Sequence, residues 1–404
     1  MVPRRLPHAL ALASLLALAA PVLAEDKAAD LAKAVAAAEK GDAVTAEPLL
    51  RPLALDNNEA AAWLGYLLVQ HGDEDNVREG MILLRRAAFA GNARAKYGLA
   101  FQYLNGSGTD RNDIEAARLF HEAADGGIAR AAYNLGLMYA NGRGVPRDPA
   151  QALKWYEQAA RAGDPYGSYA WARAMETSPQ APQRWAEIAP LYLAAAKAGH
   201  VPAAVRYGAM LLEGRGVSRD RARAEFWLRH AADHGYPEAA LLMGDLFGQM
   251  ALSRTGRQQE EAAKSAASWY LRAAEAGVAI AQAKLGNCYF AGAGVPRDFP
   301  TAQRWYRRAA NQGNADAQYV LGVWLSGGVA GTTDPVEGYR LLVLAERQGH
   351  SNAAKVRARA VEKLSPDQIQ RGDQAALSFV PKPERLPSAD EEAPTLKPPT
   401  GKVP

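Results

Sequence analysis

One short motif recurs along this chain at a nearly fixed interval, and that recurrence constrains the fold more than any other feature. The segment Ala-Ala-x-x-Gly, or a one-residue variant of it, closes successive stretches that are 36 residues apart, with one interval of 42. Chance does not produce such a ladder, so the 404-residue chain is predicted to be a repeat protein rather than a set of separate domains. The closing glycines are Gly91, Gly127, Gly163, Gly199, Gly235, Gly277, Gly313 and Gly349.

The best-formed repeat, residues 129–163, predicts two antiparallel helices. Leu135 and Met138 share one face at helical spacing, and Tyr156 and Ala159 do the same further on. A single hairpin of this kind cannot bury its own apolar face, so neighbouring repeats must stack. A second ladder, of small residues that allow close helix packing, runs through Gly65, Ala100, Gly136, Ala172, Gly208, Gly244, Gly286 and Gly322.

The residues between the two helices carry turn and cap signals. Gly142 and Gly144 supply the positive φ that a tight turn needs. Asp148 can cap the second helix, with Pro149 at its first position, and Gly163 fits a left-handed C-terminal cap. The Gly-x-Gly pairs lack the strand–turn–helix setting of a phosphate-binding loop, so we interpret them as structural.

These motifs together resemble the Sel-one-like repeat (SLR) family, an α-helical relative of the tetratricopeptide repeat. The resemblance rests on Leu-Gly-x-x-Tyr at 135–139, Gly-x-Gly-Val-x-x-Asp at 142–148 and Trp-Tyr-x-x-Ala-Ala-x-x-Gly at 155–163. It implies an all-α fold, an α/α solenoid in the form of a right-handed superhelix. About eight 36-residue helix-turn-helix repeats would span residues 58–350, with N- and C-terminal capping helices.

Two repeats depart from the pattern. The fourth has Ser178-Pro-Gln in place of Gly-x-Gly, Arg184 where the capping aspartate belongs, and Pro190 inside its second helix, where a kink is predicted. The sixth has six extra residues between Gln249 and Lys264, which predict either a surface loop or a lengthened helix.

The N-terminal end predicts export. Arg4 and Arg5 precede an uncharged apolar stretch that ends in Val22-Leu23-Ala24, so residues 1–24 are predicted to be a secretory signal peptide. The apolar stretch is too short for a stable membrane insertion, and a periplasmic or secreted bacterial protein is expected. Residues 25–57 are predicted to form a degenerate helical hairpin.

The C-terminal end predicts a cap followed by a tail. Residues 351–379 are predicted to form C-terminal capping helices, the last of which opens with a capping box at Ser365. Residues 380–404 contain seven prolines and no periodicity, so a disordered, proline-rich tail is predicted there.

No arrangement of residues predicts catalysis, a metal or a cofactor. Cys288 occupies an apolar core position, where burial raises the thiol pKa. The segment beginning at His121 lacks the second histidine of a zinc-protease motif, His230 and His234 lack a third ligand, and His200 is interpreted as a loop residue. Lysine and arginine exceed aspartate and glutamate by only +4, too little for nucleic-acid binding.

The predicted partner surface is the inner wall of the solenoid, which the first helix of each repeat would line. Its richest part is expected in repeats two to four, because tyrosine and arginine dominate binding hot spots. For Tyr97 and Tyr133 the alternative is packing against the neighbouring helix. The candidate groove residues are Arg94, Tyr97, Phe101, Arg130, Tyr133, Asn141, Tyr166, Tyr169 and Arg173.

The predicted function is therefore that of an exported, non-enzymatic scaffold. It would be a monomer that holds a protein or peptide partner in its groove, and the resemblance implies adaptor roles such as envelope signalling or secretion. The alternative is a cell-wall-directed envelope enzyme, or a protein that binds β-lactams or peptidoglycan. The cysteines of the β-lactam-binding relatives are absent, and no nucleophile–base pair is present to support an enzyme.

Overall fold

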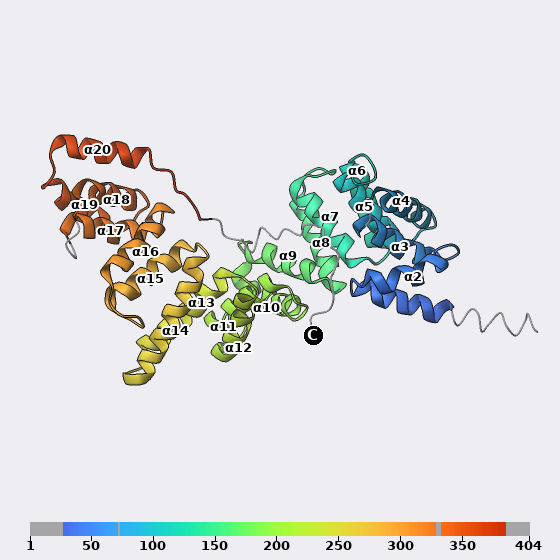
Figure 1. Ribbon diagram of the computed structural model, residues 1–404, viewed down its shortest axis with the longest axis horizontal. Coiled ribbons are helices and arrows are strands. Elements are labelled where there is room, and N and C mark those ends of the chain that lie inside the picture. Colours follow the sequence, from blue (N-terminus) through green and yellow to red (C-terminus); the bar gives the residue numbers. More distant parts are fainter. Residues whose placement is uncertain (1–26, 72, 329–332, 385–404) are drawn as a thin grey trace, which may run out of the picture. The chain divides into compact units, whose positions relative to one another are not determined.

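The computed structural model describes residues 27–71, 73–328 and 333–384 (Figure 1). Within these ranges the regular elements are all helices, which confirms the predicted all-α fold of helix-turn-helix repeats. The predicted signal peptide, residues 1–24, lies outside the described residues. The described chain divides after His200 into two compact units, which we call the N-terminal unit and the C-terminal unit.

The N-terminal unit begins with a helix over residues 27–39, which pairs with α2 (Ala43–Leu53) ahead of the first full repeat. Four hairpins follow, and each joins two helices of a repeat. They are α3 (Asn58–His71) with α4 (Glu74–Phe89), α5 (Ala93–Asn105) with α6 (Asp113–Asp125), α7 (Ala129–Asn141) with α8 (Pro149–Arg161), and α9 (Pro165–Glu176) with α10 (Ala181–Lys197).

The C-terminal unit contains repeats five to eight and two closing helices. The hairpins are α11 (Val201–Glu213) with α12 (Arg221–Asp233), α13 (Pro237–Leu252) with α14 (Gly256–Glu275), α15 (Ala279–Ala291) with α16 (Phe299–Asn311), and α17 (Ala315–Gly327) with α18 (Pro335–Arg347). The closing helices are α19 (Ala353–Val361) and α20 (Pro366–Leu377).

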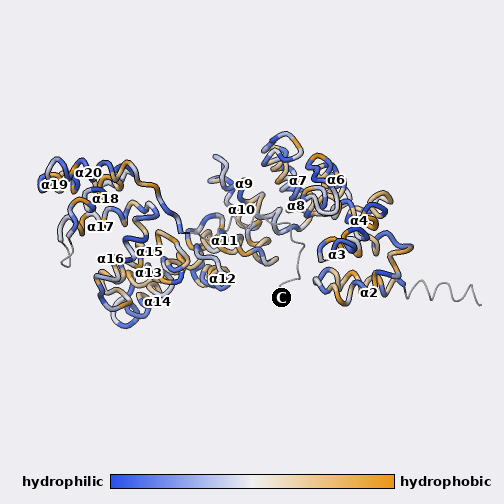
Figure 2. The backbone as a smooth tube through the Cα atoms, turned by 45° about the horizontal axis from the view of Figure 1, so that its top comes forward, coloured by the Kyte–Doolittle hydropathy of each residue, from blue (hydrophilic) through white to orange (hydrophobic). Residues whose placement is uncertain are grey.

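The third repeat forms its hairpin as its sequence predicts. The Asp148 carboxylate accepts hydrogen bonds from the amides of Ala150 and Gln151 at 2.9 and 3.1 Å, and so caps α8. Gly142 and Gly163 have φ values of 69° and 85°, the left-handed conformation that ends a helix. Polar and apolar residues alternate along the helices (Figure 2), and the apolar ones fill the space inside and between hairpins.

The ladder of small residues marks where the two helices of a hairpin touch. A Cβ atom at Gly136 would lie 2.6 Å from the ring of Tyr156 on the partner helix. Gly286 has the same relation to Tyr306, at 2.8 Å. The glycine on the first helix therefore makes room for a large side chain on the second, which explains why both recur with the same period.

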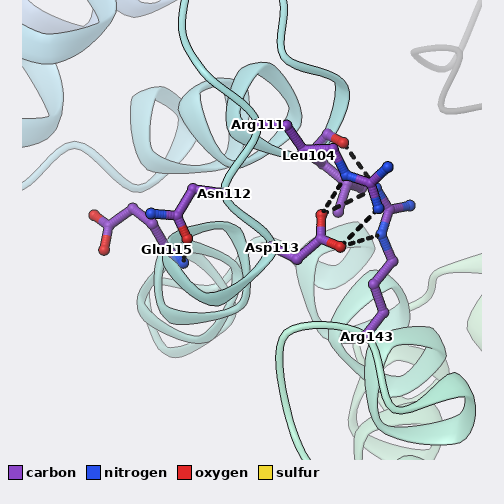
Figure 3. A network of polar contacts seen from close by, with 6 residues as sticks. All are labelled: Leu104, Arg111, Asn112, Asp113, Glu115 and Arg143. Atoms are coloured by element: carbon purple, nitrogen blue, oxygen red, sulfur yellow. Dashed lines mark hydrogen bonds and ion pairs between the residues drawn. The ribbon is translucent and has the colours of Figure 1, made fainter.

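Successive repeats interlock through their turns (Figure 3). Arg143 of the third repeat donates to the carbonyl oxygen of Leu104 at 2.7 Å and to the Asp113 carboxylate at 3.0 Å. Arg111 donates to the same carboxylate at 2.8 Å, and the two guanidinium groups hold the pKa of Asp113 well below its ordinary value. A Cβ atom at Gly144 would lie 2.0 Å from the backbone oxygen of Asp113. The Gly-x-Gly pair thus serves contact between repeats, and both arginines beside it pair with the Asp113 carboxylate.

The first helices of neighbouring repeats form one layer. In the N-terminal unit α3 packs against α5, and α7 packs against α9. That the first helices line the inner side of the stack stays a prediction.

The two irregular repeats, the fourth and the sixth, differ from the others in their helices. In the sixth repeat the extra residues lengthen both helices, to 16 residues in α13 and 20 in α14, so the insertion is a helix extension rather than a surface loop. In the fourth repeat α10 runs through Pro190, and its N-cap residue, Gln180, makes no side-chain capping bond. The weak start of α10 agrees with the missing aspartate.

The C-terminal end is ordered further than its composition predicts. Ser365 and Gln368 form the predicted capping box of α20, and the Tyr339 hydroxyl donates to Asp373 at 3.0 Å to tie α20 to α18. Residues 380–384, the first part of the predicted disordered tail, make defined hydrogen bonds to the seventh repeat. The remainder of that tail lies outside the described residues.

Candidate functional site

The fourth repeat presents a continuous cluster of aromatic rings. The Tyr166 ring on α9 lies 5.8 Å from the ring of Tyr133 on α7 and 4.8 Å from the ring of His200, which follows α10. The His200 ring lies 4.4 Å from Tyr169, whose own ring is 5.8 Å from that of Tyr192. Two of these rings, Tyr166 and Tyr169, are only partly buried, so they form the accessible surface of the cluster.

An arginine–aspartate pair fixes one end of this cluster. Arg130 Nε lies 2.5 Å from the Asp164 carboxylate, and the two side chains are only 14% and 5% exposed. The same carboxylate caps α9 by accepting from the amide of Gly167 at 2.7 Å. The Arg130 guanidinium also lies 4.0 Å from the centre of the Tyr166 ring, a cation–π geometry. Burial by itself would lower the pKa of Arg130, but the Asp164 carboxylate keeps it raised.

His200 is the central ring of the cluster and is buried. Burial, together with the charge of Arg130, lowers the pKa of His200 from 6.5 to about 3. The imidazole is therefore neutral near neutral pH and acts as a packing ring between Tyr166 and Tyr169. His200 does lie between two helices, as the sequence predicts, but its ring is enclosed by two tyrosines of its own repeat rather than exposed.

The other end of the cluster carries a second charged pair. Arg173 Nη1 lies 4.0 Å from Glu176, one helical turn further along α9. Glu176 also accepts a hydrogen bond from the Tyr192 hydroxyl at 2.5 Å. Arg173 lies one helical turn after Tyr169 on α9 and is 28% exposed, and a guanidinium can bind a carboxylate through two hydrogen bonds.

The remaining predicted groove residues are less available. Tyr97, Phe101 and Tyr133 are buried, and Tyr97 and Phe101 pack edge to face with ring centres 4.8 Å apart. For Tyr97 and Tyr133, packing against neighbours is therefore the observed role. Arg94 stacks over Trp63 at 3.9 Å, and Asn141 is exposed at the end of α7.

Sequence reasoning missed the part that His200, Asp164 and Tyr192 play in this cluster. One signal was available for the histidine. A tyrosine on the first helix is followed 31 residues later by a histidine after the closing glycine, at Tyr169 and again at Tyr319. The second pair is also in contact, with the Tyr319 and His350 rings stacked 4.1 Å apart. The spacing therefore identifies a ring-on-ring contact within a repeat.

Within the described residues there is no group of three or more histidine, cysteine, aspartate or glutamate side chains placed to hold a metal ion. Burial raises the pKa of the Cys288 thiol to about 11, which makes it a poor nucleophile. None of the described helices is both long and apolar enough to cross a bilayer.

Comparison with known proteins gives a consistent picture. A family model described as the Sel1 repeat matches seven segments, which are residues 58–92, 93–128, 129–164, 201–236, 237–278, 279–314 and 315–350. The unmatched stretch between them, residues 165–200, is the fourth repeat. A comparison with curated proteins finds no match.

Two solved structures are similar over most of the chain. A Sel1 repeat protein from Oxalobacter formigenes is 32% identical, with a TM-score of 0.54 over 79% of this chain and 90% of that one. A protective antigen of uropathogenic Escherichia coli strains, which displays an SLR fold, is 23% identical, with a TM-score of 0.57 over 87% of this chain and 84% of that one. The second similarity concerns the fold alone.

Proposed function

Because the chain belongs to the Sel1 repeat family, whose members are in general protein-interaction scaffolds, we propose that it is an exported scaffold that binds a protein or peptide partner. The proposed site is the exposed face of the aromatic cluster in the fourth repeat, with Tyr166, Tyr169 and Arg173 as its anchors. Repeat proteins of this architecture use the inner layer of first helices as their binding surface.

One observation carries this proposal. The only interruption of the Sel1 matches between residues 58 and 350 is the repeat that holds the cluster. This repeat lacks the turn glycines and the capping aspartate of the family pattern, so its surface can differ from that of the matched repeats. Two partly buried tyrosines beside an arginine supply rigid apolar area and a two-pronged hydrogen-bond donor, the residue types that dominate hot spots.

The cluster is built for binding rather than for a reaction. Its histidine is kept neutral by burial at a pKa of about 3, too low for a general base at neutral pH. Its carboxylates are engaged in structural contacts, Asp164 with Arg130 and Glu176 with Tyr192. A non-enzymatic role therefore fits better than a cell-wall-directed enzyme, which would need an available nucleophile and base.

Export is part of the proposal and rests on residues 1–24. If they act as a signal peptide, the mature chain begins at Glu25 in the periplasm or medium. Intact-mass measurement of the protein from the cell envelope tests this. Retention of residues 1–24 would contradict cleavage and indicate an anchored form.

Affinity capture from the envelope fraction tests the site. The wild-type chain and the double variant Tyr169→Ala, Arg173→Ala are compared by quantitative mass spectrometry. A partner held at this site should be recovered at least tenfold less with the variant, since hot-spot truncations each cost on the order of 1–2 kcal/mol. Circular dichroism of the variant should retain the wild-type helical signal.

The matched control is Arg161→Ala, which removes an exposed arginine on α8 that pairs only with Glu157 within its own helix. Recovery with this variant should equal that of the wild type. If the double variant recovers the same partners at the same level, the fourth repeat is not the binding site.

A further inference from the structure

The chain returns to its own seventh repeat after the last helix. Beyond α20, the Lys382 amide donates to the carbonyl oxygen of Asn311 at 3.0 Å, and the Glu384 amide donates to the Gln312 side-chain oxygen at 3.0 Å. In Figure 1 this segment runs back from α20 along the C-terminal unit. We call residues 379–384 the strap.

The strap contacts the repeat in an extended conformation that its prolines suit. Its bonded amides, at Lys382 and Glu384, are two residues apart, the spacing at which an extended chain points its amides the same way. The intervening positions, Pro381 and Pro383, have no amide hydrogen to lose. Proline also restricts the unbound segment to extended conformations, which lowers the entropy lost on binding.

The strap ends with a carboxylate that pairs with Arg308 at the surface of the seventh repeat, where the Arg308 and Glu384 side chains are 40% and 32% exposed. The Glu384 carboxylate accepts from Gln282 Nε2 at 2.9 Å and from Arg308 Nε at 3.0 Å, with a further bond from Arg308 Nη2. Gly277 allows this approach, because a Cβ atom there would lie 2.9 Å from the Cβ of Glu384. The arginine, followed by the glutamine, holds the pKa of Glu384 below its ordinary value.

The groups that bind Glu384 are preorganised by glutamines of the seventh repeat and by backbone carbonyls at the end of the sixth. Gln312 Nε2 donates to Gln282 Oε1 at 2.9 Å and to the carbonyl oxygen of Gly277 at 2.9 Å. Because the Gln282 oxygen accepts from Gln312, its amide hydrogens are left to face the Ala274 carbonyl and the incoming carboxylate. Gln282 is fully buried, so the donor that meets Glu384 is held in one orientation.

Comparison of the repeats shows which of these residues are particular to the seventh. The eighth repeat has the same glutamine pair, with Gln348 Nε2 donating to Gln318 Oε1 at 2.7 Å. The position of Arg308 is Leu344 in that repeat. No other repeat of the sequence combines both glutamines with an arginine at this position. The glutamine pair therefore belongs to repeat packing, whereas the added arginine allows the pair to bind a carboxylate.

We propose that the seventh repeat is a second peptide-binding site, specific for an extended Pro-x-Pro-Glu segment, and that the strap occupies it in cis. The site uses residues of the C-terminal unit only and is independent of the function proposed above. A segment of the same chemistry on a partner would compete with the strap. A tethered ligand has a millimolar effective concentration, so the partner would bind weakly until the strap is released.

Fluorescence anisotropy of a labelled peptide, Ser-Phe-Val-Pro-Lys-Pro-Glu-Arg-Leu-Pro-Ser, tests the site in the full-length chain. Glu384→Lys places a positive charge against Arg308 and should release the strap without touching any repeat. This variant should bind the peptide at least tenfold more tightly than the wild type. A peptide with Gln in place of Glu should bind at least tenfold more weakly.

The double variant Glu384→Lys, Arg308→Ala should bind the peptide at least tenfold more weakly than Glu384→Lys alone. The control is Glu384→Lys, Arg307→Ala, which should keep the affinity of Glu384→Lys because Arg307 is an exposed neighbour on the same helix. Hydrogen exchange tests whether the variant Glu384→Lys is folded. The amides of residues 382 and 384 should exchange faster in this variant than in the wild type, whereas the exchange rates of the amides in α15 and α16 should not change. Equal peptide binding by wild type and Glu384→Lys, or no binding by either, would overturn the proposal.

Discussion

Acidification should destabilise the N-terminal unit through His200. The unfolded chain holds this imidazole at an ordinary pKa of 6.5, while burial and the charge of Arg130 lower it to about 3 in the folded chain. Below pH 6.5 the unfolded state therefore binds a proton that the folded state does not. The stability that His200 allows is fully present above that pH and is lost as the pH falls toward 3.

The size of the effect follows from the two pKa values. Between the two pKa values, the free energy of unfolding falls by at most about 1.4 kcal/mol for each pH unit of acidification. Acidification from about pH 7.5 to about pH 5 should therefore lower it by roughly 2 kcal/mol because of His200. Tyr166 and Tyr169 pack against the ring, and the positive charge of Arg130 opposes its protonation.

The variant His200→Phe keeps a ring between the two tyrosines and removes the titration. Urea unfolding followed by circular dichroism, at about pH 7.5 and about pH 5, compares the two chains. The wild type should lose roughly 2 kcal/mol more than the variant on acidification. His121→Phe, at an exposed site, should behave as the wild type does. Equal losses in wild type and His200→Phe would refute the burial argument.

Three further expectations concern stability. Gly144→Ala should lower the free energy of unfolding, measured by thermal unfolding, by about 2–4 kcal/mol, because its Cβ would meet the Asp113 backbone. The control is Gly127→Ala, which is also at positive φ but has nothing within 4 Å, and should lower it by about 1 kcal/mol. Arg130→Ala should lower the free energy of unfolding by about 3 kcal/mol or more, because it leaves the Asp164 carboxylate buried without its cation. The control Arg161→Ala removes an exposed ion pair and should lower it by under about 1 kcal/mol. After removal of the predicted C-terminal tail, limited proteolysis should cut next near residues 178–184, where α10 starts without a side-chain cap; uniform resistance there would contradict this.

The site could be predicted in part. The repeat register correctly places Tyr166, Tyr169 and Arg173 on a first helix with some exposed surface. The same register places Tyr97 and Phe101 in equivalent surroundings, yet both are buried against Phe120 of the adjoining helix. Exposure depends on the size of the neighbouring side chains, which differ from repeat to repeat. A shared pattern cannot supply that information.

The amino-acid sequence by itself determined the family, the hairpin and the register of the repeats. Those properties depend on residues within one repeat length: glycines at turns, aspartates at caps and small residues opposite large ones. Only the tertiary structure decided that His200 is enclosed by two tyrosines of its own repeat. It alone also decided that Glu384 binds Arg308, 76 residues away in the chain. Contacts of this kind arise from packing between distant segments, and no local period records them.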